Sequence, residues 1–206
     1  MFGTVFEKWR RVDYIVNNHT AWIDTGYMGT GGCMMECVLA KDTDNGEFIF
    51  GSHNNADIQN YEYERNIIDT KGVRSNAWFH MNKQGDYTEE NEYNTVIVTG
   101  KKYTARMDNR GVYHICYLNG IKYIDRNNGH VLNPTNDVAF SYAHYDNSCI
   151  KGGRLYAAKI WDKDGVLVRD FIPVVQNDGK AGLLDLVNKK FYGSMTNDNF
   201  NYGELK

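Results

Sequence analysis

Residues 154–173 read RLYAAKIWDKDGVLVRDFIP, and this segment carries the clearest structural signal in the chain. Apolar residues alternate with polar ones on both sides of Asp164-Gly165, and a period of two is typical of a half-buried strand. Asp-Gly also supplies the positive φ angles that a tight hairpin turn requires. The segment therefore predicts two paired strands, Arg154–Trp161 and Val166–Ile172.

The same period of two recurs along most of the chain. Between its segments lie three hairpin signals, Asn109-Arg110-Gly111, Asn119-Gly120 and Asn127-Asn128-Gly129. Further strands are expected at Val12–Val16, Ala21–Thr25, Cys33–Ala40, Glu47–Gly51, Ala77–Met81, Asn94–Thr99, Tyr103–Met107, Val112–Leu118, Lys122–Asp125, Val138–Ala143, Ala181–Asp185 and Lys190–Gly193. No segment has a sustained helical apolar stripe, so helix is expected for at most a turn or two, near Asn54–Ile58 or Asp185–Asn188. The longest stretch expected to be irregular is Asp57–Val73.

Length and composition fit a single domain. The chain has 206 residues, of which 42% are hydrophobic and 24% charged, and it includes 15 Tyr but only 2 Pro. Aromatic residues fit the pleated, half-buried surface of a sheet. Many short strands separated by turn signals are typical of a sandwich or barrel. We therefore predict one all-β domain over residues 1–206, built as an antiparallel sandwich of two sheets.

The formal net charge of −3 bears on the class of partner. A weakly acidic chain without a basic stripe gains little from counterion release, so nucleic acid is not an expected partner. Its apolar runs are far shorter than the ~20 residues that a membrane helix needs, so no membrane is expected either. Residues 1–10 show no apolar region of a secretion signal, which favours synthesis in the cytoplasm.

Several blocks of sequence together carry a family resemblance. In the second half they are Arg154–Trp161, Gly165–Pro173, Gly182–Asn188 (GLLDLVN) and Lys190–Tyr192 (KFY). In the first half they are Tyr14-Ile15, Trp22–Gly26 (WIDTG) and Phe50-Gly51. The chain resembles the laminin-G-like, concanavalin-A-like jelly rolls of gut bacteria and their phages. The resemblance implies a jelly roll and spans nearly the whole chain.

Five polar or turn residues belong to this signature: Asp24, Gly26, Arg169, Asp170 and Asp185. Arg169 and Asp170 are neighbours in a strand, so their charges are expected on opposite faces of the sheet. A lone buried charge is costly, so Arg169, if it faces inward, needs Asp24 or Asp185 as a partner. The end of the sandwich is expected to be closed by four apolar residues, Leu183, Leu184, Leu186 and Phe191. The signature thus identifies a fold and marks no active site.

Catalysis is not expected, although concanavalin-like sandwiches include glucanases. Glycoside hydrolysis needs two carboxylates at a fixed separation. Glu62 and Glu64 have a suitable spacing but fall in an expected loop, and Glu36 stands alone in its strand. A second acidic loop holds Glu89, Glu90 and Glu92. A glycoside hydrolase is therefore the least favoured of the functions considered.

No cofactor and no metal are predicted. Asp42–Gly46 is acidic and ends in Gly, but it lacks the late Glu of an EF-hand loop, and we interpret it and Asp162–Gly165 as turns. The resemblance leaves room for a weak calcium site at the rim of the sandwich. No His or Cys residues have the spacing of a zinc site. Cys33 and Cys37 lie roughly 13 Å apart along one strand face, too far to bond, so buried free thiols are expected there, as at Cys116 and Cys149.

Sugar binding is the usual conjecture for the family and needs an aromatic platform with nearby amides or carboxylates. The alternative interpretation is that the aromatic residues near loops are ordinary rim and core residues. The candidate glycan-binding residues are Tyr61, Tyr63, Trp78, Tyr87, Tyr142, Tyr145 and Asn147.

A domain of this family without a stalk or anchor suggests a component of a phage particle. We expect it to dock on other virion proteins of the capsid or tail, to assemble in the bacterial host cytoplasm, and to face host or mucosal glycans. Residues 1–10 and 196–206 are expected to be docking tails, because chain ends are free to order on a partner. The alternative is a free, lectin-like carbohydrate-binding module.

Overall fold

The computed structural model describes residues 8–17, 20–28, 32–40, 47–53, 65–71, 76–80, 100–108, 110–127, 141–142 and 153–206. Every regular element within these residues is a β-strand, and every strand pair is antiparallel. The predicted all-β class is therefore confirmed. No helix among the described residues has the length and apolar character needed to cross a membrane.

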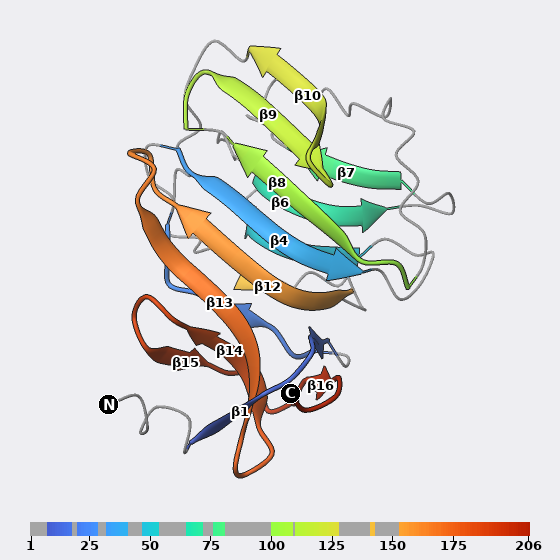
Figure 1. The fold of residues 1–206 in the computed structure, drawn as a ribbon, viewed down its shortest axis with the longest axis vertical. Helices are drawn as coiled ribbons and strands as arrows, with labels where there is room; N and C mark the ends of the chain where they lie inside the picture. The colour runs from blue at the N-terminus through green and yellow to red at the C-terminus, as the bar shows by residue number, and fades with distance from the viewer. Residues whose placement is uncertain are drawn as a thin grey trace, which may run out of the picture.

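A large sheet of eleven strands dominates the molecule (Figure 1). Its main path runs through β10 (Ile121–Asn127), β9 (Tyr113–Leu118), β8 (Tyr103–Asp108), β4 (Met34–Ala40), β12 (Arg154–Trp161), β13 (Leu167–Gln176), β14 (Ala181–Asp185) and β15 (Lys190–Tyr192). Three short strands join this path at its lower end in Figure 1: β1 (Trp9–Arg11), β2 (Ile15–Val16) and β16 (Asn201–Tyr202). β1 pairs with β13, while β2 pairs with both β12 and β16.

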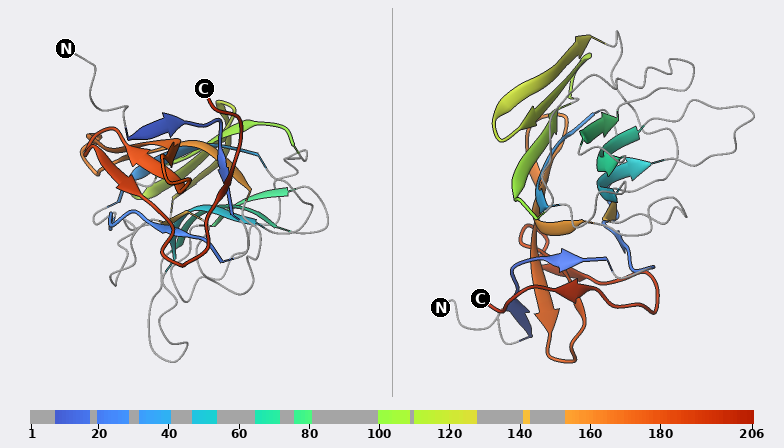
Figure 2. Two further views of the ribbon diagram at one scale, coloured as in Figure 1. Left: turned by 90° about the horizontal axis from the view of Figure 1, so that it is seen from below. Right: turned by 90° about the vertical axis from the view of Figure 1, so that its right-hand side faces the viewer.

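A smaller sheet of five strands forms the second layer. Its order is β3 (Ile23–Asp24), β11 (Ser141–Tyr142), β5 (Glu47–His53), β6 (Arg65–Lys71) and β7 (Asn76–His80). Figure 2 shows the two sheets as layers that face one another. The chain passes between them repeatedly, because β4, β8 and β12 belong to the large sheet while β5, β7 and β11 belong to the small one. The arrangement is compatible with a β-sandwich.

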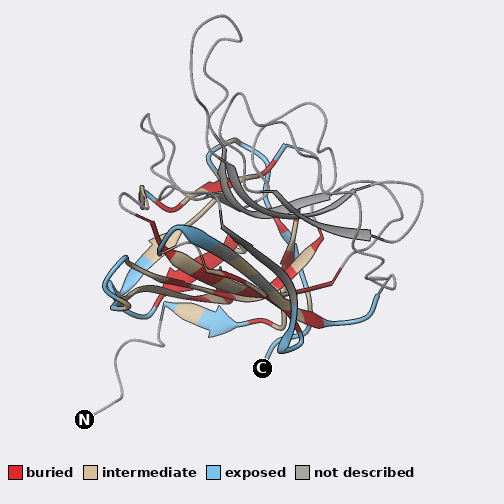
Figure 3. Ribbon diagram, turned by 90° about the horizontal axis from the view of Figure 1, so that it is seen from above, coloured by how far each residue is buried: buried red, intermediate tan, exposed pale blue. Residues whose placement is uncertain are grey.

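The core lies on the inner face of the large sheet. In β8, and in β4 as far as Leu39, each buried residue alternates with a half-exposed one, so period two places one face of each strand inside. Figure 3 shows buried residues, in red, gathered along the strands of the large sheet. The largest fully buried side chains are Phe171, Phe200, Ile15, Ile23, Met35 and Leu39. These residues come from both ends of the chain, so the core closes only when the two ends meet.

The predicted strands of the second half agree best with the structure. β12 and β14 have the predicted bounds, and the turn at Asp164-Gly165 is present, with Gly165 at a φ of 81°. At Asn119-Gly120 the φ angles are 51° and 80°, and the predicted hairpin joins β9 to β10. The Asn119 side chain also accepts the Thr104 backbone N–H at 2.9 Å, which fixes the turn against β8.

Four expectations need correction. β6 lies inside Asp57–Val73, which was expected to be irregular, because its cross-strand bonds to β5 and β7 override a weak apolar pattern. Asp185–Asn188 ends a strand and begins a turn, and contains no helix. Leu186 does not close the sandwich, since it is 43% exposed on that turn, whereas Leu183 and Leu184 are buried. The predictions for Asn54–Ile58 and Asn94–Thr99 fall outside the described residues.

The fourth correction concerns residues 196–206, which were expected to be a free tail. Phe200 is buried, β16 pairs with β2, and Leu205 forms an isolated bridge with Val12. The Lys206 backbone N–H also donates to the Arg11 carbonyl at 3.0 Å. This end is therefore part of the fold, the premise that it is free is wrong, and its docking role stays a prediction. At the other end, residues 8–10 enter β1 and residues 1–7 fall outside the described part.

Candidate functional site

Arg169 and Asp185 form an ion pair on the inner side of the large sheet, on neighbouring strands β13 and β14. Arg169 Nε lies 3.6 Å from Asp185 Oδ2, and the two side chains are 16% and 0% exposed. Of the two partners that the sequence offered, Asp185 is the one that pairs. Asp24 instead accepts the Gly26 backbone N–H at 2.7 Å and so caps the turn that follows β3.

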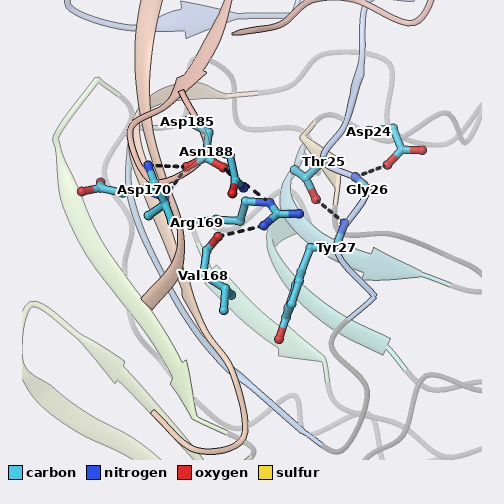
Figure 4. Close-up of polar contacts among 10 residues, drawn as sticks. Asp24, Thr25, Gly26, Tyr27, Val168, Arg169, Asp170, Asp185 and Asn188 are labelled. Carbon is cyan, nitrogen blue, oxygen red and sulfur yellow. Dashed lines mark hydrogen bonds and ion pairs between the residues drawn. The ribbon is translucent and has the colours of Figure 1, made fainter. Parts of the chain in front are cut away.

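The carboxylate of Asp185 is also a hub of hydrogen bonds (Figure 4). Its Oδ1 accepts the backbone N–H groups of Asp170 at 3.1 Å and Val187 at 3.0 Å. Its Oδ2 accepts the Asn188 side-chain amide at 2.7 Å. A buried carboxylate that satisfies its oxygens with protein donors is stable in place but is not offered to a substrate. Asp185 therefore ties β13, β14 and the turn after β14 together.

Tyr27 connects the turn after β3 to Arg169. The guanidinium carbon lies 5.4 Å from the centre of the Tyr27 ring, and Arg169 Nη1 donates to the Val168 carbonyl at 2.8 Å. Burial, followed by the charges of Cys33 and Asp162, raises the pKa of Tyr27 to about 12, while Arg169 opposes the shift. The phenol is thus neutral at ordinary pH, and the contact braces the turn rather than creating a base or nucleophile.

Cys33 and Cys37 are buried free thiols, as the sequence predicted. Burial raises the pKa of both thiols, most strongly through the loss of solvent around the thiolate. A thiol, not a thiolate, is therefore present at neutral pH, and neither group is suited to act as a nucleophile or metal ligand. The side chains of Cys116 and Cys149 lie outside the described part of the structure.

On the outer face of the large sheet, charged residues of four strands stand in a row. Asp170 Oδ2 lies 3.7 Å from Lys159 Nζ on β12, and Lys159 is directly opposite Glu36 on β4. Glu36 Oε2 lies 4.0 Å from Arg106 Nε on β8, whose guanidinium carbon is 4.9 Å from the Tyr117 ring on β9. We call Arg106, Glu36, Lys159 and Asp170 the charged row. Glu36, considered above as a lone carboxylate, thus has basic cross-strand neighbours.

The turn at Asp162–Gly165 is held by its own first residue. Asp162 Oδ1 accepts the backbone N–H groups of Asp164 at 3.0 Å and Val166 at 2.9 Å. These bonds are typical of a side chain that mimics a turn of backbone. The interpretation of this segment as a turn is therefore confirmed. The other acidic turn that the sequence predicts, Asp42–Gly46, falls outside the described residues.

The candidate glycan-binding residues fall partly inside and partly outside the described residues. Trp78 and Tyr142 lie on β7 and β11 of the small sheet. The other candidates, Tyr61, Tyr63, Tyr87, Tyr145 and Asn147, fall outside the described residues, as do the acids Glu62, Glu64, Glu89, Glu90 and Glu92. Within the described residues, no group of three or more His, Cys, Asp or Glu side chains is placed to hold a metal ion. The sugar, calcium and hydrolase hypotheses remain predictions.

A scan against protein-family models finds no family that matches this chain, and a search of curated proteins finds no match. The functional assignment therefore depends on the residues themselves and on their geometry. Of the five signature residues, Arg169 and Asp185 are drawn together, Asp24 and Gly26 form the turn beside Tyr27, and Asp170 faces outward.

The sequence did not reveal the charged row. Period two does predict that Glu36, Arg106 and Lys159 each lie on the polar face of their own strands. The missing information is strand order, since β8, β4 and β12 are neighbours in the sheet but far apart in the chain. Register then decides which charges stand opposite one another.

Proposed function

We propose that this chain is a non-enzymatic binding domain of a phage particle, which docks on other virion proteins of the capsid or tail. The finer fold that we propose is a laminin-G-like, concanavalin-A-like jelly roll. Two antiparallel sheets, with a chain that passes between them four times from β4 to β12, support this fold. The sequence blocks quoted above support the phage context.

The observation that carries the non-enzymatic proposal is the placement of the signature charges. Asp185 is buried and Arg169 is largely buried, the two face each other at 3.6 Å, and both make hydrogen bonds to neighbouring backbone. Such groups hold the architecture together and have no access to a substrate. Because these charges stabilise the fold, a binding function can reside on the outer surfaces instead.

The outer face of the large sheet supports docking. No further layer of described strands covers β9, β8, β4 and β12 on the side away from the small sheet (Figure 2). This face combines the charged row with Trp161, which lies directly opposite Met34 on β4. A broad, mixed polar and aromatic face suits contact with another protein better than it suits the enclosure of a small molecule.

The proposal is tested on purified particles of a phage that encodes this chain. Quantitative mass spectrometry should find the protein at a fixed copy number per particle after density-gradient purification and a high-salt wash. Absence of the chain from such particles overturns the virion proposal. If it is absent and its melting temperature instead rises with one class of glycan on a panel, the lectin-like alternative replaces it.

A further inference from the structure

Cations from four separate segments gather where β2, β12, the start of β8 and the last residues of the chain meet. They are Arg11, Lys101, Lys102, Arg154 and Lys206, and we call this surface the basic end. Lys101 lies at its margin, with its Nζ 5.6 Å from the Tyr103 ring. Arg11, Lys101, Lys102 and Lys206 are exposed, and Arg154 is half-buried. Apart from Lys101 and Lys102, which are adjacent, these residues are far apart in the sequence. The fold alone therefore brings them together.

Two tyrosines hold the central cations in place. Tyr14 and Tyr156 meet edge to face, with ring centres 5.3 Å apart. Lys102 Nζ lies 3.7 Å from the centre of the Tyr156 ring, and the Arg154 guanidinium carbon lies 4.8 Å from that of Tyr14. A cation held over an aromatic face gains electrostatic stabilisation and loses less freedom when a partner arrives. The basic end is therefore partly preorganised.

The C-terminal segment holds Tyr14 and the cations around it in place. The Gly203 backbone N–H donates to the Tyr14 carbonyl at 3.0 Å, and a Cβ at position 203 would lie 2.6 Å from the Tyr14 ring. Only a residue without a side chain lets the C-terminal segment lie this close to the ring. The segment thereby brings Lys206 beside Asp13, with which it forms an ion pair.

The local charge is opposite to that of the chain as a whole, whose net charge is −3. The carboxylates of the described residues beside the basic end are Asp13, Glu204 and the terminal carboxyl group of Lys206, still fewer than the cations around them. The hydrogen bond from Lys206 is the main cause that lowers the pKa of Asp13; burial opposes it, and the charges of Lys206, Lys102 and Arg11 each lower the pKa further. Cations from three segments thus act on one point, which indicates a positive potential at this end.

We propose that the basic end is a docking surface for an acidic segment of a partner protein. The inference rests on the proposed docking function and adds the surface and its chemistry. Carboxylates pair well with Arg and Lys in charge-assisted hydrogen bonds. The described part of the surface offers no open aromatic platform for a sugar or base, because Lys102 and Arg154 already lie over the tyrosine rings. An acidic peptide needs only the cations.

The experiment uses the purified full chain and a fluorescein-labelled poly-glutamate peptide as the probe. Fluorescence anisotropy should show binding that weakens as salt rises from about 50 to about 200 mM, because exposed charges are screened over about 8–10 Å. The double variant Lys101→Glu/Lys102→Glu should raise the Kd at least about tenfold, since it places like charges against the probe. A milder variant, Lys101→Gln/Lys102→Gln, should raise it by a smaller factor and serves if the first does not fold.

The matched control is Lys163→Glu/Lys180→Glu, which makes the same change in net charge at two exposed lysines outside the basic end. It should change the Kd by less than about twofold, because Lys163 and Lys180 lie in the turns after β12 and β13, which contribute no cation to the basic end. Equal loss in both double variants, or no binding by the parent chain, overturns the proposal. Tighter binding of oligogalacturonate or of oligothymidylate than of the peptide overturns it in favour of a glycan or nucleic-acid partner. Particle association is not measured here, so failure of this test is distinct from failure of the virion proposal.

Discussion

Arg169 and Asp170 are neighbours in β13, yet their two ion pairs are opposite in character. Arg169 pairs inward with Asp185 at 3.6 Å, and Asp170 pairs outward with Lys159 at 3.7 Å. The distances are nearly equal, but Asp185 is fully buried whereas the Lys159 side chain is 41% exposed. Burial, and not distance, therefore decides how much each pair matters to the fold.

The physical reason lies in solvation. Water screens the outward pair and would solvate either partner if the other were removed, so an exposed pair contributes about 0.2–1 kcal/mol. Removing one member of a buried pair leaves a charge that water cannot reach, which costs about 3–5 kcal/mol. β13 therefore carries one charge on its inner face that stabilises the fold and one on its outer face that contributes little to stability.

The largest expected effect comes from removing the inward carboxylate. Asp185→Ala should lower the free energy of unfolding by about 3–5 kcal/mol, because it strands Arg169 and three hydrogen-bond donors. Urea unfolding followed by tryptophan fluorescence measures the change. Arg169→Met is the matched control and should cost less, about 1–3 kcal/mol, since Asp185 keeps its hydrogen bonds. If Asp185→Ala costs less than 1 kcal/mol by this measurement, the buried pair is not the brace described here.

The next effect concerns pH on the inner side. The pKa of Tyr27 is raised to about 12 from an ordinary value of 10, so the folded chain keeps a proton that the unfolded chain loses. Stability is therefore retained below about pH 10 and falls as pH rises toward about 12. Tyr27→Phe keeps the ring beside Arg169 and should show a shallower fall over this window. Unfolding in urea at several pH values gives the two slopes.

The buried thiols Cys33 and Cys37 act in the same direction, because burial raises their pKa as well. They are present in both proteins, so the difference between the two slopes reports on Tyr27 together with its interaction with Cys33. Identical slopes would show that the phenol ionises equally in the folded and unfolded chains, contrary to its half-buried position.

The smallest effect is expected on the outer face. A double-mutant cycle of Lys159→Met and Asp170→Asn should give a coupling of about 0.2–1 kcal/mol in the free energy of unfolding. That coupling should diminish in about 1 M salt, where screening acts over about 3 Å. A coupling larger than the loss caused by Arg169→Met would reverse the order of the two faces, and the comparison would fail.

The sequence predicts the architecture best where the alternation is regular. β12 and β14 have their predicted bounds because apolar residues recur at period two up to a clear turn. β6 was missed because Arg65–Lys71 reads RNIIDTK, in which only two adjacent residues are apolar. Its strand conformation depends on pairing with β5 and β7, which no local pattern reports.

The sites were less predictable than the strands, for a related reason. That Arg169 needs an acidic partner follows from the cost of a buried charge, but the choice of Asp185 over Asp24 depends on which strands are neighbours. The sequence alone placed Leu186 inside, because an apolar side chain after the end of a strand does not show which side of the turn it occupies. The charged row and the basic end need the full strand order, because their members come from distant parts of the chain.

The pairing of β16 with β2 has a consequence for the order of folding. Tyr202 is the partner of Ile15, and Leu205 is the partner of Val12. The first strands can therefore complete their pairing only after these residues, far along the sequence, have been synthesised. Contacts of such long sequence separation carry a high loop-closure cost and slow the formation of β-rich domains. During synthesis on the ribosome, the buried face around Ile15 therefore stays incomplete until the last residues emerge.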